Sequence, residues 1–256
     1  MNRTFNKCDN VLIEKRRKKI FLKKCILFFI FIISVFLVLC FKLPYFNISN
    51  ISVVNNKLVT KEEIIKLCAI KAGNNIFYIN TSRSSEKILK NPYILSAKVE
   101  RKFPNNIIID VVEREAMYYN IKDNKYLVID KNGIVLEERE EINNMRLIKL
   151  EGFDYNKAEI GMKLTSDDDR RIEAVSELAK IVKANKFFLK VTNIDVTNPY
   201  ALNVYYGNIC IKLGSCDNID KKLNAAANIL ERDELKQGKG YIDVSFDGNP
   251  VFFMEK

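Results

Sequence analysis

The chain has 256 residues and a formal net charge of +10, and it contains no histidine. The absence of histidine excludes Ser-His-Asp and Cys-His catalysis as well as zinc sites that use imidazole ligands. Its six cysteines include no C-x-x-C pair, so the spacing disfavours a metal knuckle.

An apolar run of seventeen residues, Cys25 to Phe41, divides the chain into two unequal parts. It contains one serine and no charge, glycine or proline, and as a helix it would be about 26 Å long, slightly short of a ~30 Å hydrocarbon core. With its flanks it predicts a transmembrane helix over residues 25–43. A cleaved signal peptide is the alternative, but the run exceeds the usual apolar region of about 7–15 residues and no A-x-A-like site follows.

The basic residues predict the orientation of this span. Residues 1–24 hold nine lysines and arginines against two acids, and the positive-inside rule therefore predicts a cytoplasmic tail over residues 1–24. We expect this tail to lack regular structure. Everything after Phe41 is expected outside the cytoplasm, on a single-pass membrane protein. A nucleic-acid patch is the competing interpretation, and the position of the charges beside an apolar run disfavours it.

Residues 45–116 are predicted to form a small α+β domain. Thr60 and Glu63 form a capping box that begins a helix, and Gly73 is expected to end it. Pro104 and two asparagines predict a turn between two strands. The expected order is β-α-α-β-β, with the elements at Tyr45–Val54, after Thr60, Ser82–Leu89, Ala97–Phe103 and Ile107–Glu113.

Residues 117–256 are predicted to form a mixed sheet with helices. Asn132-Gly133 is a strong hairpin signal within residues 125–137. Ser166 and the three following aspartates suit the start of a helix, although three adjacent acids could also mark a cation site. Apolar stripes then predict two buried helix faces. These are Ile172, Val175, Leu178, Ala179 and Val182 in one helix, and Ile219, Leu223, Ala226 and Leu230 in the other.

Further strands are predicted at residues 146–150, 191–196, 201–205 and 209–213. Two terminal strands, Tyr241–Phe246 and Val251–Met254, are predicted to close the chain. Cys210 and Cys216 could pair only if Gly214, which lies between these two cysteines, turned the chain back. The simpler interpretation is two small residues that pack without a bridge.

The order of these segments resembles the DivIB/FtsQ family of bacterial cell-division proteins. FNISNISVVNN, TKEEII, GNNIFYIN and KNPYILSAKVERKFPNNIIIDVVERE resemble the family's POTRA domain. LVIDKNGIVLEE, ICIKLG and YIDVSFDGNPVFF resemble the β-domain that follows it. The chain has Asn55 where the family often has glycine, and asparagine tolerates the left-handed conformation that a turn there requires. The resemblance implies an α+β fold with a transmembrane helix, a POTRA domain at 45–116 and a β-domain at 117–256.

The resemblance implies a non-enzymatic scaffold at the division septum. Expected partners are FtsL-like and DivIC-like coiled-coil membrane proteins and other divisome membrane proteins, in a complex that regulates septal peptidoglycan synthesis. No cofactor, metal, nucleic acid or small-molecule substrate is expected. Two alternatives are a POTRA protein of polypeptide translocation and a tethered cell-wall enzyme, but neither repeated POTRA copies nor a nucleophile motif is visible.

Two surfaces are candidates for partner binding. The terminal strands are predicted to bind a partner by strand addition. The expected residues are Tyr241, Asp243, Ser245, Phe246, Val251 and Phe253, with Phe246 and Phe253 at positions where the family carries aromatic side chains. The alternative is that both phenylalanines face the core. In the POTRA region Arg101, Lys102 and Phe103 are contact candidates, and a solvated strand end is the competing interpretation.

Overall fold

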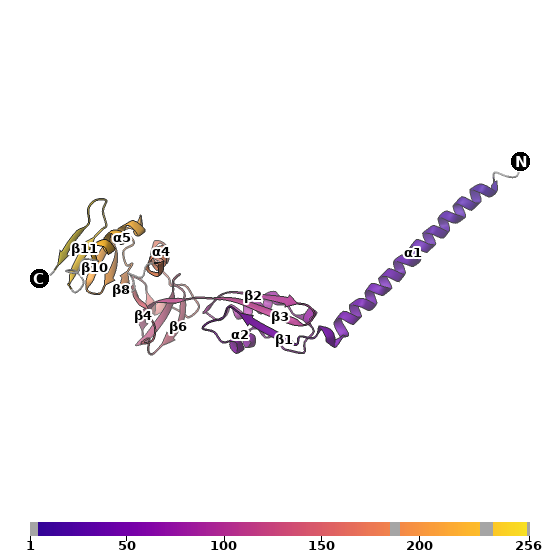
Figure 1. Ribbon diagram of the computed structural model, residues 1–256, viewed down its shortest axis with the longest axis horizontal. Coiled ribbons are helices and arrows are strands. Elements are labelled where there is room, and N and C mark those ends of the chain that lie inside the picture. The colour runs from indigo at the N-terminus through magenta and orange to yellow at the C-terminus, as the bar shows by residue number, and fades with distance from the viewer. Residues whose placement is uncertain (1–4, 185–189, 231–237, 255–256) are drawn as a thin grey trace. The chain divides into compact units, whose positions relative to one another are not determined.

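The computed structural model of the chain describes residues 5–184, 190–230 and 238–254. Its elements are a long N-terminal helix, a three-stranded sheet, a nine-stranded sheet and the helices that accompany them (Figure 1). This arrangement confirms the predicted α+β class. By its internal contacts the chain forms two compact units, which are described separately. The first comprises residues 1–55, 61–85 and 98–110, and the second comprises 56–60, 86–97 and 111–256.

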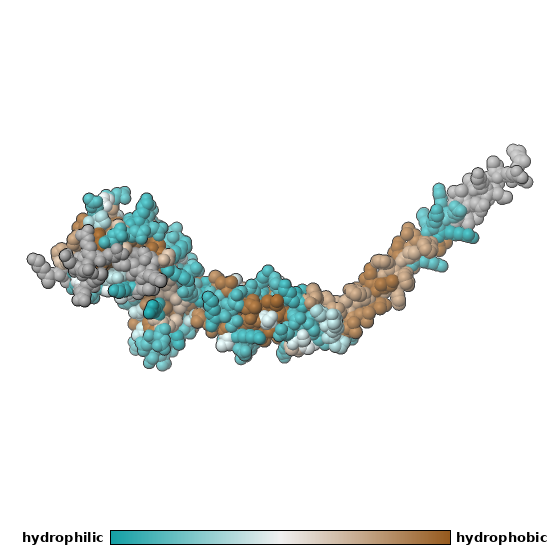
Figure 2. Space-filling view, viewed as in Figure 1, coloured by the Kyte–Doolittle hydropathy of each residue, from teal (hydrophilic) through white to brown (hydrophobic). Residues whose placement is uncertain are grey.

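Helix α1 (Phe5–Lys42) contains the predicted span except its last residue, Leu43, and most of the predicted tail. The prediction of an irregular tail is therefore wrong for the described residues. Lysine, arginine and glutamate are good helix formers, and no glycine or proline interrupts the sequence before Pro44. The part from Glu14 to Lys42 is long and apolar enough to cross a membrane. Figure 2 shows this helix brown along its apolar run and teal at the preceding basic residues.

The three-stranded sheet has the predicted β-α-α-β-β order. Strand β1 begins later than predicted because Pro44–Phe46 forms a 3-10 helix. Helix α2 ends at Cys68, and Ala69 rather than Gly73 takes the left-handed conformation there, with φ of 55°. The elements are β1 (Asn50–Val54), α2 (Lys61–Cys68), α3 (Thr81–Ile88), β2 (Ile94–Lys102) and β3 (Asn106–Glu113), and the strand order is β1-β3-β2.

The second sheet has the order β12-β11-β10-β9-β8-β7-β4-β5-β6. The predicted hairpin around Gly133 is present, and β4 is a strand that the sequence patterns did not predict. The strands are β4 (Ala116–Lys122), β5 (Lys125–Asp130), β6 (Val135–Arg139), β7 (Ile148–Glu151), β8 (Val191–Asp195), β9 (Leu202–Tyr206), β10 (Ile209–Gly214), β11 (Gly240–Asp243) and β12 (Val251–Met254).

Helices α4 (Arg170–Ala184) and α5 (Ile219–Leu230) contribute their predicted apolar stripes to one core with this sheet, and every residue predicted for the two buried faces is buried. Tyr118 of β4 is also fully buried, and its hydroxyl donates to the carbonyl of Val175 at 2.9 Å. Cys210 and Cys216 are both free, so the interpretation as two unbridged residues holds in this structure.

A buried ion pair fixes the turn between β5 and β6. The Asp130 carboxylate, 1% exposed, accepts a hydrogen bond from Arg114 at 2.9 Å and lies within the second unit with it. Its other oxygen accepts the backbone N–H groups of Asn132 and Ile134, both at 2.8 Å. The neighbouring Glu113 accepts three more backbone N–H groups, from residues 57, 58 and 59. The two adjacent residues therefore hold two loops through hydrogen bonds: Glu113 holds residues 57–59, and Arg114 holds the turn after β5 through Asp130.

We expect Asp130→Ala to lower the free energy of unfolding by about 3 kcal/mol, because it leaves the largely buried Arg114 guanidinium and two turn N–H groups without their acceptor. Urea unfolding of the full-length protein in detergent measures this. Glu177→Ala is the matched control, since its ion pair with Lys180 is exposed and the loss should stay within about 0.5 kcal/mol. Equal losses for the two variants would contradict the role given to Asp130.

Burial also predicts sensitivity to alkaline pH. It raises the pKa of the Tyr118 hydroxyl above the ordinary value of 10.0. Above about pH 10 the unfolded tyrosine loses its proton while the folded one keeps it, so the unfolded state binds fewer protons and stability falls as pH rises. Burial also raises the pKa of the Tyr155 hydroxyl, which adds to the same loss of stability at alkaline pH.

We therefore expect Tyr118→Phe to make the loss of stability above about pH 10 less steep, by up to about 1.4 kcal/mol per pH unit. Unfolding of both proteins at about pH 8 and about pH 11 tests this. The difference at the lower pH isolates the lost hydrogen bond to Val175. Parallel stability curves for the two proteins would contradict the assignment.

Candidate functional site

Strand β12 forms one edge of the nine-stranded sheet. Among the described residues it pairs antiparallel with β11 and with no other strand. β11 in turn runs parallel to β10, with α5 in the connection between them. The predicted edge position of the last strand is therefore present in this structure, and Figure 1 shows β11 and β10 beside the end of the chain.

The opposite edge of the same sheet, at β6, is covered. The backbone of the segment around Gly161 and Met162 bonds to Val135 on both of its polar groups, at 2.8 and 3.0 Å. Leu164 donates to the carbonyl of Gly133 nearby. β6 also ends in the charged residues Glu137, Glu138 and Arg139, which discourage strand pairing. Of the two edges, β12 is the one with space for another strand in the part of the chain that is described.

The ladder shows which backbone groups of β12 face outward. Gly240 and Val244 donate their N–H groups to the carbonyls of Asn208 and Lys212, toward β10. By alternation, Tyr241 and Asp243 face β12, where their register partners are Phe253 and Val251. The remaining residues of β12, Phe252 and Met254, therefore direct their N–H and C=O groups toward the open edge.

Four predicted site residues share one face of the terminal strands. Tyr241 and Phe253 are register partners, and their rings stack with centroids 5.7 Å apart. Asp243 and Val251 form the next pair on the same face. Lys212 of β10 adds a cation over the Tyr241 ring, with its Nζ 4.0 Å from the ring centroid. This face combines two aromatic rings with opposite charges at its margin.

The other two predicted residues, Ser245 and Phe246, lie in the turn rather than on a strand. The prediction that the strand continues to Phe246 is wrong, because β11 ends at Asp243. The Asp243 carboxylate accepts hydrogen bonds from both the N–H and the hydroxyl of Ser245, which turns the chain. Phe246 is half-exposed and lines a pocket with residues of α5, including Lys221 and Lys222.

Sequence reasoning missed Phe252 as a site residue. It pairs with the buried Ile242, so it lies on the sheet face opposite Phe253, yet it is 48% exposed where Phe253 is 52% exposed. The sequence did contain a signal for Phe252. Two adjacent phenylalanines in a strand place one ring on each face of the sheet, because successive residues point to opposite faces. The edge thus presents one phenylalanine on each face.

The three candidates at the end of β2 differ in their surroundings. Arg101 donates to the backbone carbonyls of Ile76, at 3.0 Å, and of Ile79. Its guanidinium therefore supports the 3-10 helix η2 (Ile76–Tyr78) in the same unit. Lys102 is exposed, and the Phe103 ring contacts Phe77 at 5.4 Å between centroids.

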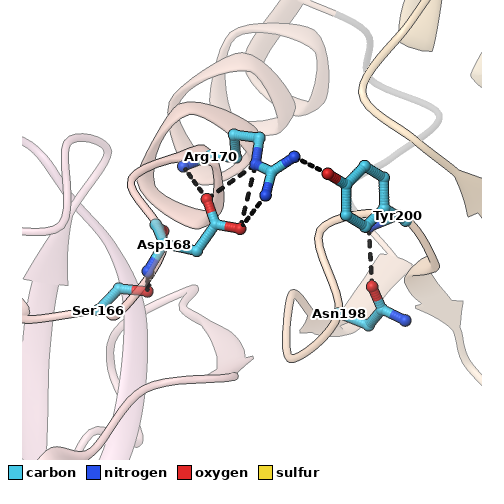
Figure 3. Close-up of polar contacts among 5 residues, drawn as sticks. All are labelled: Ser166, Asp168, Arg170, Asn198 and Tyr200. Carbon is cyan, nitrogen blue, oxygen red and sulfur yellow. Dashed lines mark hydrogen bonds and ion pairs between the residues drawn. The ribbon is translucent and has the colours of Figure 1, made fainter.

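The three aspartates precede α4, which begins at Arg170. Asp168 accepts hydrogen bonds from the Arg170 backbone at 3.0 Å and from its guanidinium, as Figure 3 shows. These hydrogen bonds hold the pKa of the Asp168 carboxyl below its usual value. Arg170 also bonds the Tyr200 hydroxyl. Asp168 therefore stabilises the start of α4 through these hydrogen bonds. No group of three metal-binding side chains occurs among the described residues.

Two family models match consecutive parts of the chain. One is described as the POTRA domain, FtsQ-type, and matches residues 46–114. The other is described as Cell division protein FtsQ/DivIB, C-terminal, and matches residues 117–245. The second match ends before Phe246 and β12. The domain boundaries at 45–116 and 117–256 stay predictions.

Curated relatives are similar over nearly the whole chain. The cell division protein DivIB of Clostridium botulinum (strain Hall) is 47% identical over 249 residues, which cover 97% of this chain and 96% of the relative. DivIB of Clostridium acetobutylicum is 40% identical, with 97% and 99% covered. The cell division protein FtsQ of Syntrophotalea carbinolica is 30% identical, with 79% and 71% covered.

Proposed function

The chain belongs to the FtsQ/DivIB family of bacterial cell-division proteins, and from that premise we propose that it is a non-enzymatic scaffold of the septum. It binds FtsL-like and DivIC-like bitopic proteins and thereby organises septal peptidoglycan synthesis. The observation that supports the binding role is the open edge at β12.

The proposed mode of binding is strand addition. A partner segment pairs with the outward backbone groups of Phe252 and Met254 and extends the sheet by one strand. These two residues offer four hydrogen bonds at most, each worth about 0.5–1.5 kcal/mol net. A micromolar complex requires about 8 kcal/mol, so backbone pairing alone is too weak.

Side chains supply the difference. Burial of one exposed phenylalanine contributes about 1.5–3 kcal/mol. Phe246, Phe252 and Phe253 are all about half-exposed and lie on or beside the edge. A strand added to β12 brings alternate side chains to both faces of the sheet, next to Phe252 on one and Phe253 on the other. Selectivity then depends on the side chains of the partner, including those that approach Lys212.

The proposed location is the cell membrane, with concentration at the septum. The basic residues from Lys15 to Lys24 precede the apolar run and support a cytoplasmic N-terminus. The two sheets then lie outside the cytoplasm, where the outer segments of bitopic partners are accessible. The same orientation brings the partners into one membrane, which raises their effective concentration.

The first test separates backbone pairing from side-chain contact at one position. We expect Phe252→Pro to weaken capture of a DivIC-type partner at least tenfold more than Phe252→Ala, because only proline removes the outward N–H. Phe252→Ala is the matched control for the loss of the ring. Affinity is measured between full-length proteins in nanodiscs, after circular dichroism has shown that both variants are folded. Equal affinities for the two variants would rule out strand addition through this edge.

The second test concerns the turn. We expect Phe246→Ala to weaken partner binding by tenfold or more, while the thermal unfolding midpoint stays within a few degrees. Tyr200→Ala is the control, since Tyr200 is another exposed aromatic residue of the second unit and lies outside the terminal strands. Wild-type affinity in the Phe246 variant would remove this residue from the interface. A strongly lowered midpoint would assign it to the core instead.

A further inference from the structure

Five aromatic side chains gather where the candidate span ends. We call Phe41, Phe46, Phe77, Tyr78 and Phe103 the aromatic tip. Within the first unit, the Phe41 ring lies 5.8 Å from Phe77 and 5.2 Å from Tyr78, centroid to centroid. Phe77 in turn contacts Phe46 at 5.2 Å and Phe103 at 5.4 Å. Residues from three separate parts of the sequence thus form one connected group.

Much of this group is exposed. Tyr78 is 70% and Phe103 is 60% exposed, and the neighbouring Leu43 and Tyr45 are exposed as well. Single exposed apolar residues need no explanation, but a connected patch of them marks a surface that contacts something other than water. Phe41 is the last residue of the apolar run. The patch is therefore continuous with the surface of the span.

We propose that the aromatic tip lies in the interfacial layer of the bilayer, among lipid headgroups and the upper parts of the acyl chains. The inference rests on the proposed membrane insertion of α1. With Phe41 at the edge of the hydrocarbon, rings 5–6 Å from it fall within a headgroup layer that is about 5–8 Å thick. Aromatic side chains, tyrosine among them, are enriched at this level of membranes.

The length of the span favours the same position. A helix over the seventeen-residue run is about 26 Å long, against a ~30 Å core. A short span is accommodated when the bilayer thins or when flanking residues are drawn toward it. Here the flanking group contains Leu43 and the rings of Phe77 and Tyr78. Its apolar surface compensates for the missing length of the helix.

Several backbone carbonyls around the tip accept hydrogen bonds from within the chain, as a site with little water requires. The last carbonyls of a helix lack intrahelical partners and normally bond water. In α1, the Leu39 carbonyl accepts from the Leu43 N–H at 2.9 Å, and the Cys40 carbonyl accepts from the buried Asn75 side chain at 3.0 Å. The same amide approaches the Phe41 carbonyl at 3.4 Å. The Arg101 guanidinium likewise donates to the carbonyl of Ile76 in η2 and to the carbonyl of Ile79, the residue after η2.

The chemistry at the margin of the tip suits phospholipid. Lys42 follows Phe41 and Lys102 precedes Phe103, and both lysines are exposed. A lysine can lay its stem along apolar surface while its ammonium group reaches the phosphate level. An aromatic patch bordered by cations favours lipid over a wholly apolar protein surface.

The absence of tryptophan from the chain permits a direct test. Three single-tryptophan variants of the full-length protein, Phe31→Trp, Phe103→Trp and Tyr200→Trp, are reconstituted in nanodiscs of phosphatidylcholine and phosphatidylglycerol. Quenching of their emission is measured with brominated phospholipid and with aqueous iodide. Phe31 lies in the span and reports insertion. Tyr200, 62% exposed in the loop between β8 and β9, matches Phe103 in exposure.

We expect brominated lipid to quench Trp at 31 and at 103, and to leave Trp at 200 sensitive to iodide alone. If Trp at 31 is not quenched by lipid, the proposed membrane insertion fails. If Trp at 31 is quenched but Trp at 103 responds to iodide like Trp at 200, insertion stands and the interfacial position of the tip is overturned. Shielding of Trp at 103 from both quenchers would also overturn it and would indicate contact with a second copy of the chain.

Discussion

The requirement that backbone N–H and C=O groups find partners is the constraint on which the larger sheet depends. Its interior strands pair with a neighbouring strand on both sides, and the β6 edge finds partners for Val135 in the segment around Gly161 and Met162. Strand β12 does so on one side only within the described residues. Because the β6 edge is partly covered and charged while the β12 edge is short and apolar, β12 is the edge of this sheet better suited to an added strand in the described part of the chain.

The position of that edge follows from the connection before it. β10 and β11 run parallel, so the chain must cross from one end of the sheet to the other between them, and α5 lies in this crossover. The helix packs its apolar stripe onto the sheet and contributes to the same core as Ile211 and Ile242. A connection over residues 244–250 then places β12 antiparallel outside β11. Core packing therefore fixes β11, while β12 is held by its ladder with β11 and by the Tyr241–Phe253 stack.

The elements that could be predicted from the sequence are those whose signal is local. The stripes of α4 and α5, the Gly133 hairpin and the order of the first domain are set by periodicity and turn residues. β4 could not be predicted in this way, because its residues mix aromatic and polar side chains and its burial depends on Tyr118 reaching a helix carbonyl. The end of β11 depends on a hydrogen bond between Asp243 and Ser245, and the sequence pattern alone suggested a longer strand. The sheet face on which Phe252 lies could be determined only from its register with Ile242.

The two exposed aromatic surfaces differ in the backbone groups beside them, and this difference supports a different proposed partner for each. At β12 the rings flank unpaired N–H and C=O groups, which a polypeptide can satisfy and a lipid acyl chain cannot. At the aromatic tip, Asn75 donates to the Cys40 carbonyl and Arg101 donates to the carbonyls of Ile76 and Ile79, so these three acceptors are already bonded within the chain. Exposed phenylalanine alone would assign neither surface. Combined with the state of the backbone, it supports the proposed protein segment at the first and the proposed lipid contact at the second.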